Sequence, residues 1–273
     1  MPLQVAKVKN AVRRELPKFG IIGILNPIET VLELRGGLAL TGGANTIEIQ
    51  LHKCRIGTSG QHIMASELAQ VITDYFSRPG SKPIILTDPI IKDKNGVCDI
   101  SIKDQVNFWL DLPDILVDII NDPQKLIYVD MDLNLIRQVA KLSRQQIFPW
   151  EKVIVSQHYT ANTPQDSELR QILCEMETTK ALAGIVLTTL AKDEGDVVQL
   201  ERLYKNRTDK RPLIAFAKGE AGQSSQIECL TTWGGAGTYA YIGGRGKSTN
   251  GMLTVEEMSE IPRVREALGR KKK

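Results

Sequence analysis

The sequence predicts an α/β fold, a single-domain (β/α)8 TIM barrel. Short runs rich in β-branched and aromatic residues alternate with amphipathic stretches, and eight such runs follow one another along the chain. This alternation implies a parallel sheet, and eight units imply that the sheet closes into a barrel. Runs such as 21–25 and 153–155 are apolar throughout, as strands buried on both faces are. A length of 273 residues is typical of one such barrel.

The strands are expected at residues 21–25, 46–51, 83–87, 126–130, 153–156, 185–189, 213–217 and 238–242. Amphipathic helices are expected at residues 29–40, 65–76, 102–120, 133–142 and 167–182. Asp166 or Ser167 is the expected cap of the last of these helices. A doubly wound open sheet is the alternative, but it needs a glycine-rich turn after the first strand, and residues 25–28 contain no glycine.

No change of composition divides the chain, so one barrel domain over residues 19–268 is expected. Residues 1–18 carry five basic side chains against one acidic side chain, with apolar residues at helical spacing. We expect an amphipathic helix that plugs the bottom of the barrel, and a targeting segment is the alternative. Residues 269–273 form a basic tail, which we expect to be solvated.

The composition limits the classes of partner. A net charge of +3 is too small to indicate a nucleic-acid partner, and no apolar run approaches the roughly 20 residues of a membrane span. The four cysteines form no CxxC pair, which favours a reducing compartment, the cytoplasm, with the mitochondrial matrix or another organelle as the alternative. The three histidines lie far apart in the sequence, so we expect neither a metal site nor a cofactor.

Residues 243–249 look at first like a phosphate-binding loop. The glycine that such a loop needs six residues before Lys247 is Tyr241 here, and the segment follows the last expected strand. A loop over the barrel mouth is the better interpretation. Its Arg245 could still contact an anion there, because phosphate sites in barrels favour the last two loops.

Several stretches resemble the type I 3-dehydroquinate dehydratases. Residues 153–159 and the Thr163-Pro164 pair are similar to that family's fifth-strand signature, S-x-H-D-F followed by T-P. Four further stretches resemble, in order, its motifs G-A-D-x-I-E-x-R-x-D, P-x-I-x-T, V-D-I-E-L and I-A-x-x-M-G-x-x-G-x-x-S-R: residues 43–52, 83–87, 128–133 and 213–226. The resemblance covers about residues 19–267.

The resemblance implies a (β/α)8 barrel, often dimeric, that dehydrates 3-dehydroquinate in the shikimate pathway. In that family a lysine forms an imine with the ketone and a histidine moves protons. Arginines hold the carboxylate, and a lid after the last strand closes the site. The implied partners are a small carboxylated cyclic metabolite and a second copy of the chain or another protein.

Some residues match the family's site. His158 matches the proton-transfer histidine, and Glu48 matches the second-strand glutamate. Asp132 stands for a fourth-strand glutamate, and Ser248 matches the serine of the lid.

Other residues depart from the family pattern. Leu187 is taken to stand for the imine lysine, and Gln226 for a carboxylate-binding arginine. Gln50 and Pro89 replace two further arginines, and Met252 replaces a lid glutamine. A leucine can form no imine, and a glutamine cannot form the charged bidentate clamp that arginine forms with a carboxylate.

Two hypotheses follow. The first is a catalytically inactive barrel, kept for a structural, partner-binding or metabolite-sensing role. The alternative is an active dehydratase or related lyase in which Lys218, after the seventh strand, supplies the amine. A lysine in a solvated loop is the simpler interpretation of Lys218. The candidate catalytic residues are His158, Glu48 and Lys218, and the candidate substrate-binding residues are Asp132, Gln226, Ser248 and Arg245.

Overall fold

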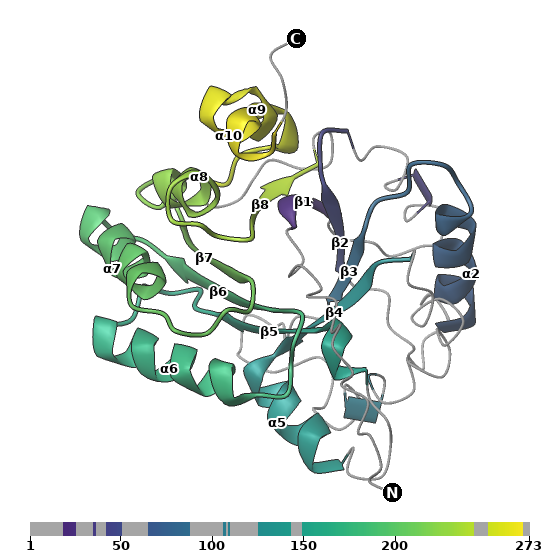
Figure 1. The fold of residues 1–273 in the computed structure, drawn as a ribbon, viewed down its shortest axis with the longest axis horizontal. Helices are drawn as coiled ribbons and strands as arrows, with labels where there is room; N and C mark the ends of the chain where they lie inside the picture. Colours follow the sequence, from purple (N-terminus) through teal and green to yellow (C-terminus); the bar gives the residue numbers. More distant parts are fainter. Residues whose placement is uncertain are drawn as a thin grey trace, which may run out of the picture.

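The computed structural model describes residues 19–25, 35–36, 42–50, 65–87, 106–107, 109, 125–142, 149–242 and 251–269. Within them, eight parallel strands form one sheet in the order β7-β6-β5-β4-β3-β2-β1-β8 (Figure 1). The strands are β1 (Gly20–Leu25), β2 (Thr46–Gln50), β3 (Ile84–Thr87), β4 (Ile127–Asp132), β5 (Val153–His158), β6 (Gly184–Leu190), β7 (Leu213–Lys218) and β8 (Gly237–Tyr241).

The two end strands of this sheet approach each other. The backbone N–H of Ala236, just before β8, donates to the carbonyl of Leu213 at the start of β7 over 2.9 Å. The sheet is therefore a nearly closed barrel, which confirms the predicted fold. Strands β4 to β7 extend further at their carboxyl ends than predicted, so Asp132, His158 and Lys218 lie within strands.

Helices surround the sheet in Figure 1. The described helices are α2 (Ala65–Phe76), α5 (Leu133–Leu142), α6 (Asp166–Thr178), α7 (Glu194–Lys205), α8 (Gln223–Thr231), α9 (Val255–Glu260) and α10 (Pro262–Ala267), with a 3-10 turn, η3 (Trp150–Lys152), before β5. The short helix α9 packs against β1 and β8.

Local sequence explains where several helices begin. Asp193 accepts a hydrogen bond from the N–H of Asp196 at the start of α7, and Thr254 forms a capping box with Glu257 at the start of α9. The expectation for α6 was wrong, because Gln165 is its N-cap residue and makes no side-chain cap bond. The Asp166 carboxylate instead accepts from Arg170 one turn later.

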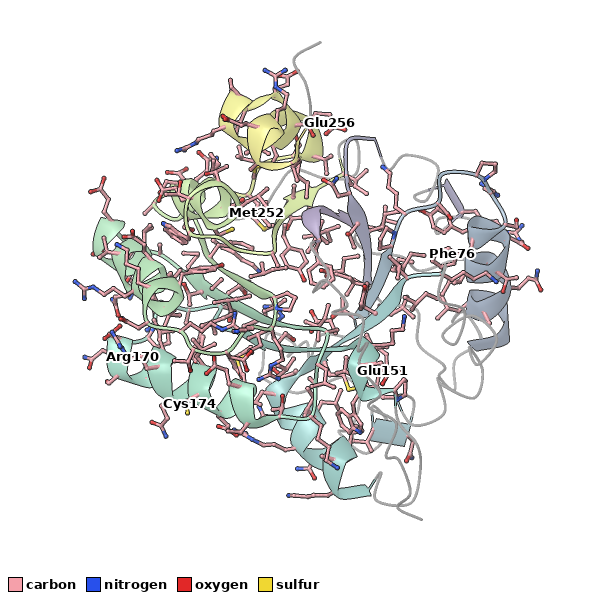
Figure 2. All side chains as sticks on the ribbon, in the orientation of Figure 1. Phe76, Glu151, Arg170, Cys174, Met252 and Glu256 are labelled. Carbon is pink, nitrogen blue, oxygen red and sulfur yellow. The ribbon has the colours of Figure 1, made fainter. Side chains whose placement is uncertain are left out.

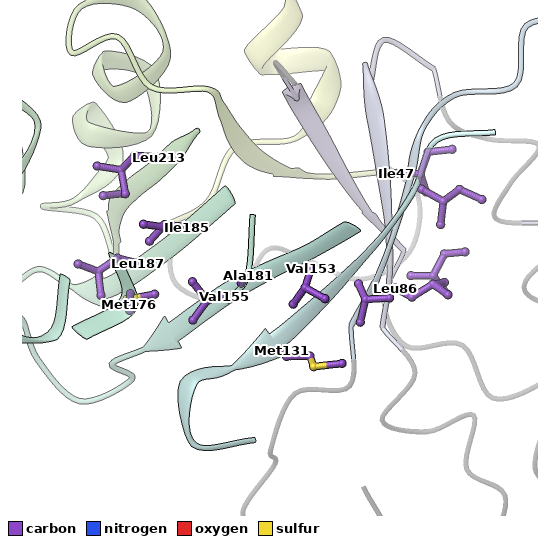
Figure 3. Packing of buried hydrophobic residues seen from close by; sticks show 14 of the residues in the cluster. Ile47, Leu86, Met131, Val153, Val155, Met176, Ala181, Ile185, Leu187 and Leu213 are labelled. Carbon is purple, nitrogen blue, oxygen red and sulfur yellow. The ribbon is translucent and has the colours of Figure 1, made fainter. Parts of the chain in front are cut away.

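The barrel has two apolar clusters, one on the outer face of its sheet and one in its interior. The outer cluster joins strand residues such as Ile47, Val155 and Leu213 to helix residues such as Leu173 and Met176 (Figure 3). The inner cluster collects residues that alternate with these along the strands: Phe19, Ile22, Ile24, Ile85, Tyr128, Ile154, Val186, Ile214, Phe216 and Tyr239. We call these residues the inner cluster.

The interpretation of Leu187 as the counterpart of the imine lysine needs correction. Its side chain is fully buried in the outer cluster, with α6 residue Met176 (Figure 3). Successive side chains of a strand point to opposite faces, and the inward residues of β6 are Val186 and Thr188. No inward residue of β6 carries an amine, as expected. The inward residues are a valine and a threonine, however, and not the leucine.

Several expectations lie outside the described residues. These are the helix over residues 1–18, the strand-end residue Pro89, the loop residues Arg245 and Ser248, and all of the basic tail except Gly269. Most of the helices expected at 29–40 and 102–120 lie outside them as well.

Candidate functional site

The inward face of five neighbouring strands changes from apolar to polar toward the carboxyl end. On β4, Tyr128 is followed by Asp130 and Asp132, and on β5, Ile154 is followed by Ser156 and His158. Strands β3, β6 and β7 change likewise. Together with polar residues of β2 and β8, these side chains form a group that we call the polar interior: Glu48, Gln50, Thr87, Asp130, Asp132, Ser156, His158, Thr188, Lys218 and Tyr239. In (β/α)8 barrels, active sites lie at this end of the strands.

Glu48 of β2 is buried in this group. Its Oε1 accepts a hydrogen bond of 3.0 Å from Nε2 of Gln50, and the Tyr239 hydroxyl also lies beside the carboxyl group. Burial raises the pKa of Glu48, and the Gln50 bond and the charge of Lys218 oppose that rise. Gln50, at a position where the resemblance implied arginine, therefore orients a neighbouring carboxyl group.

Asp130 of β4 is 3 % exposed. Burial, followed by the charges of Glu48 and Asp132, raises its pKa to about 8, while a hydrogen bond with Ser156 acts in the opposite direction. A carboxyl group with this pKa is largely protonated at neutral pH, so Asp130 can donate a proton. Its Oδ1 has no hydrogen-bond partner among the described residues.

His158 ends β5 and is only partly exposed. Its Nδ1 lies 2.7 Å from the hydroxyl oxygen of Thr188 on β6, and the direction of donation depends on the tautomer. Burial, assisted by the positive charge of Lys218, lowers the pKa of His158 to about 3. The imidazole is therefore neutral at physiological pH, and the lowered pKa makes it a weak proton acceptor.

Lys218 is the last residue of β7, beside Leu190 of β6. Ile214 and Phe216 belong to the inner cluster, so alternation turns Lys218 inward as well. Burial lowers its pKa, and the charge of Glu48 raises it in part. The solvated-loop interpretation is thus wrong. Lys218 lies close enough to Glu48 and His158 to affect the pKa of both.

The turn after Lys218 explains the glycines and the serine of the 213–226 motif. Gly219 has φ of +92°, in the left-handed region that favours glycine. A Cβ on Gly222 would lie 2.6 Å from the carbonyl oxygens of Ala217 and Lys218. The Ser225 hydroxyl accepts from the N–H of Ala217 over 2.8 Å. These three residues fix the backbone that carries Lys218.

Gln226 and Met252 lie together at the edge of the site. Gln226 of α8 is fully buried, and its Oε1 accepts from the N–H of Leu253 over 3.4 Å. Its Nε2 has no partner in the part of the chain that the structure describes. Met252 belongs to the inner apolar cluster and is labelled in Figure 2. An amide and a thioether carry no charge, so neither can supply a cation for a carboxylate.

Asp132 has a local structural partner. Its Oδ1 accepts from the N–H of Asn134 over 2.8 Å, at the first turn of α5. Burial raises its pKa, whereas the bonds from Asn134 and the charge of Arg137 lower it. The carboxyl group therefore anchors the start of α5.

The structure brings Glu48, His158, Lys218 and Asp132 to one end of the barrel and places Gln226 at its edge. The expected roles of Ser248 and Arg245 fall on residues that it does not describe. Sequence reasoning missed Asp130, Thr188 and Tyr239. The signal for Asp130 was present, because two acids alternate with apolar residues in the buried run 127–132, which turns both acids to the same face.

Among the described residues, no group of three or more His, Cys, Asp or Glu side chains could hold a metal ion. No described helix combines the length and the apolar character that crossing a bilayer requires.

Fold and site together define a (β/α)8 barrel protein with a buried lysine, histidine and carboxyl group at the carboxyl ends of its strands. The chain belongs to the type I 3-dehydroquinase family, whose model matches residues 109–268.

The chain is also similar to known proteins in part of its sequence and in its fold. It is 36% identical over 115 residues to a 3-dehydroquinate dehydratase of Dehalococcoides mccartyi, which is 42% of this chain and 50% of that protein. The chain thus spans about half the length of the curated relatives that it matches. Type I 3-dehydroquinate dehydratase from Clostridium difficile has a similar fold, with a TM-score of 0.67 and 18% identity over 93% of this chain and 92% of that one. The 3-dehydroquinate dehydratase from Geobacillus kaustophilus gives a TM-score of 0.64 at 18% identity, over 94% and 91% of the two chains.

Proposed function

We propose that this barrel is a lyase related to 3-dehydroquinate dehydratase and that Lys218 supplies the amine that β6 lacks. The observation that carries the proposal is the place of Lys218, turned into the polar interior beside His158 and Glu48, with a pKa lowered by burial. A lowered pKa increases the fraction of neutral, nucleophilic amine at a given pH. The family supports a small cyclic carbonyl compound as the substrate.

The chemistry is balanced with the groups present. The neutral Lys218 amine adds to the substrate carbonyl, and water leaves as the iminium forms. The iminium withdraws electrons, so that a base can take a proton from the neighbouring carbon while a β-hydroxyl group leaves as water. His158, neutral but weakly basic, is the candidate base, and the protonated Asp130 is the candidate acid. Hydrolysis of the product iminium then frees Lys218.

A second candidate function is a barrel that binds a metabolite or a protein partner without turnover. It is supported by Val186 and Thr188 as the inward residues of β6, and by the uncharged Gln226 and Met252 at the edge of the site. Loss of a charged contact with a carboxylate in a shielded site costs about 2–5 kcal/mol of binding free energy. A protein of this kind could keep the fold and lose the reaction.

Borohydride trapping separates the two candidates. The full-length protein is incubated with 3-dehydroquinate and sodium borohydride, and intact mass is recorded. Reduction of an iminium fixes the ligand on the amine as a stable secondary amine, so we expect one adduct on the wild type and none on Lys218→Ala. Lys192→Ala, which changes a lysine in the loop after β6, is the matched control and should keep the adduct.

Each result decides the matter. An adduct that persists in Lys218→Ala assigns the imine to another lysine and overturns the proposal. If the wild type forms no adduct but 3-dehydroquinate raises its melting temperature, binding without turnover is the better function.

A further inference from the structure

Two buried oxygens of the polar interior have no hydrogen-bond partner among the described residues. They are Oδ1 of Asp130 and the hydroxyl oxygen of Tyr239, in residues that are 3 % and 5 % exposed. The Tyr239 hydroxyl approaches Glu48 and affects its pKa, but the geometry falls short of a good hydrogen bond. A buried polar group without a partner is costly, so its presence in a native barrel calls for an explanation.

The two oxygens share one small region. The charge of Glu48 raises the pKa of both residues, and the charge of Asp130 raises the pKa of Tyr239. They come from β4 and β8, on opposite sides of β2 in the sheet order, so the contact crosses the interior of the barrel. Phe216 packs against the ring of Tyr239, with the ring centroids 6.0 Å apart, and holds the hydroxyl in place.

We infer that Asp130 and Tyr239 form the contact site for an uncharged ligand oxygen, a hydroxyl or a carbonyl, beside Glu48. The inference rests on the proposed function for the class of ligand and adds two side chains that contact an uncharged oxygen of that ligand. Both groups can donate and accept, as a hydroxyl oxygen requires. The negative charge of Glu48 and the raised pKa of Asp130 disfavour an anion at this point.

Binding without borohydride tests this site. Dissociation constants are measured by calorimetry for 3-dehydroquinate and for the uncharged probe 2-hydroxycyclohexanone. We expect both probes to bind the wild type, and Tyr239→Phe and Asp130→Ala each to weaken binding by about tenfold. Tyr204→Phe is the matched control, because the Tyr204 hydroxyl bonds the backbone of Ala215 through both its donor and its acceptor side and Tyr204 packs on the outside of β7. It should leave both constants unchanged.

The outcomes distinguish this inference from the proposed function. If Tyr239→Phe binds both probes as tightly as the wild type does, or if the wild type binds neither, the inference is wrong, whatever borohydride shows. If binding depends on Tyr239 while no borohydride adduct forms, the contact site stands and the role of Lys218 falls. Asp130→Ala repeats the test if Tyr239→Phe folds poorly, as judged by circular dichroism.

Discussion

Two clusters of polar residues, one partly buried and one largely buried, lie at opposite ends of β7, and they differ in how completely they are paired. At the amino end, Arg207, Asp209, Arg211 and Glu177 form what we call the arginine cluster. At the carboxyl end lies the polar interior, where Asp130 and Tyr239 keep unpartnered oxygens. Both clusters place charged groups in a shielded environment, but only one of them is satisfied by its neighbours.

The arginine cluster links the segment before β7 to the end of α6. The Arg211 guanidinium donates to Asp209 Oδ2 from Nε over 2.9 Å, and it also donates to the carbonyl oxygens of Ala181 and Glu177. The Glu177 carbonyl lies in the last turn of α6 and the Ala181 carbonyl lies just beyond it, so the arginine satisfies acceptors that the helix leaves free. Burial raises the pKa of Asp209, but the bonds and charge of Arg211 outweigh this and lower it overall.

The difference shows what unpaired polarity signifies in a folded barrel. The arginine cluster fixes the loop before β7 to the end of α6, and every contact serves the fold. In the polar interior, burial shifts the pKa values of Asp130, His158 and Lys218 toward their uncharged forms. Groups with shifted pKa values, together with oxygens that lack a partner, indicate a ligand site rather than a structural contact.

Removal of Arg211 should have the largest effect on stability. We expect Arg211→Ala to lower the free energy of unfolding by about 3 kcal/mol, because it removes charged hydrogen bonds to Asp209 and to the carbonyl oxygens of Ala181 and Glu177. Arg170→Ala is the control, since its ion pair with Asp166 joins two partly exposed side chains one helical turn apart, and such pairs contribute about 0.3–0.5 kcal/mol. Urea denaturation measures both. Equal losses of stability in the two variants would show that the arginine cluster contributes no more than a surface ion pair.

Asp130 and Asp209 should respond to neutralisation with opposite signs. The pKa of Asp130 is raised from 3.8 to about 8, so the folded state binds more protons than the unfolded state between these values, and stability falls as pH rises. We expect Asp130→Asn to raise the free energy of unfolding by about 1–3 kcal/mol at pH 8 and by less at pH 5. Asp209→Asn should instead destabilise at neutral pH, with a loss that shrinks as acid protonates Asp209.

The pH window for this comparison is set by His158. Its pKa is lowered from 6.5 to about 3, so its contribution to stability is lost as pH falls below 6.5, the opposite slope to that of Asp130. Between about pH 6.5 and 8 His158 contributes nothing to the slope, and the raised pKa of Asp130 makes stability fall as pH rises. Thermal unfolding in that window is the measurement. An unchanged slope in Asp130→Asn contradicts the raised pKa.

The smallest effect compares two buried tyrosine hydroxyls. Tyr204→Phe removes bonds with the backbone of Ala215 at 2.6 and 3.2 Å, and we expect a loss of about 1 kcal/mol. Tyr239→Phe removes an oxygen without a good partner, so stability should stay the same or rise. Denaturation midpoints measure both changes. A loss in Tyr239→Phe as large as that in Tyr204→Phe would make Tyr239 part of the fold rather than of the site.

The sequence predicted the barrel well because burial on both faces leaves a clear apolar pattern. Runs such as Gly20–Leu25 and Gly184–Leu190 have few alternatives, and each was predicted to within a residue. Helices α7 to α10 were less visible because they are short or have weakly apolar faces. The cap of α6 was mispredicted, since Asp166 bonds an arginine in its own helix rather than the first N–H groups.

The site was harder to predict because a run that is apolar throughout does not show which face is inward. Leu187 and Val186 are equally apolar in sequence, and only the packing against α6 places Leu187 outside. Lys218 was predicted as a candidate from its position after a strand, but its burial depends on the turn that follows. Tyr239 gave no signal, because a tyrosine in a β-rich run is ordinary.

The turn made by Gly219, Gly222 and Ser225 has one more consequence, for redesign. It sets the direction of position 218 through the backbone alone, since none of its contacts involves the lysine side chain. The side chain of a cysteine or a histidine at this position should therefore also point into the barrel. Position 218 can thus carry a different reactive group without redesign of the loop that follows it.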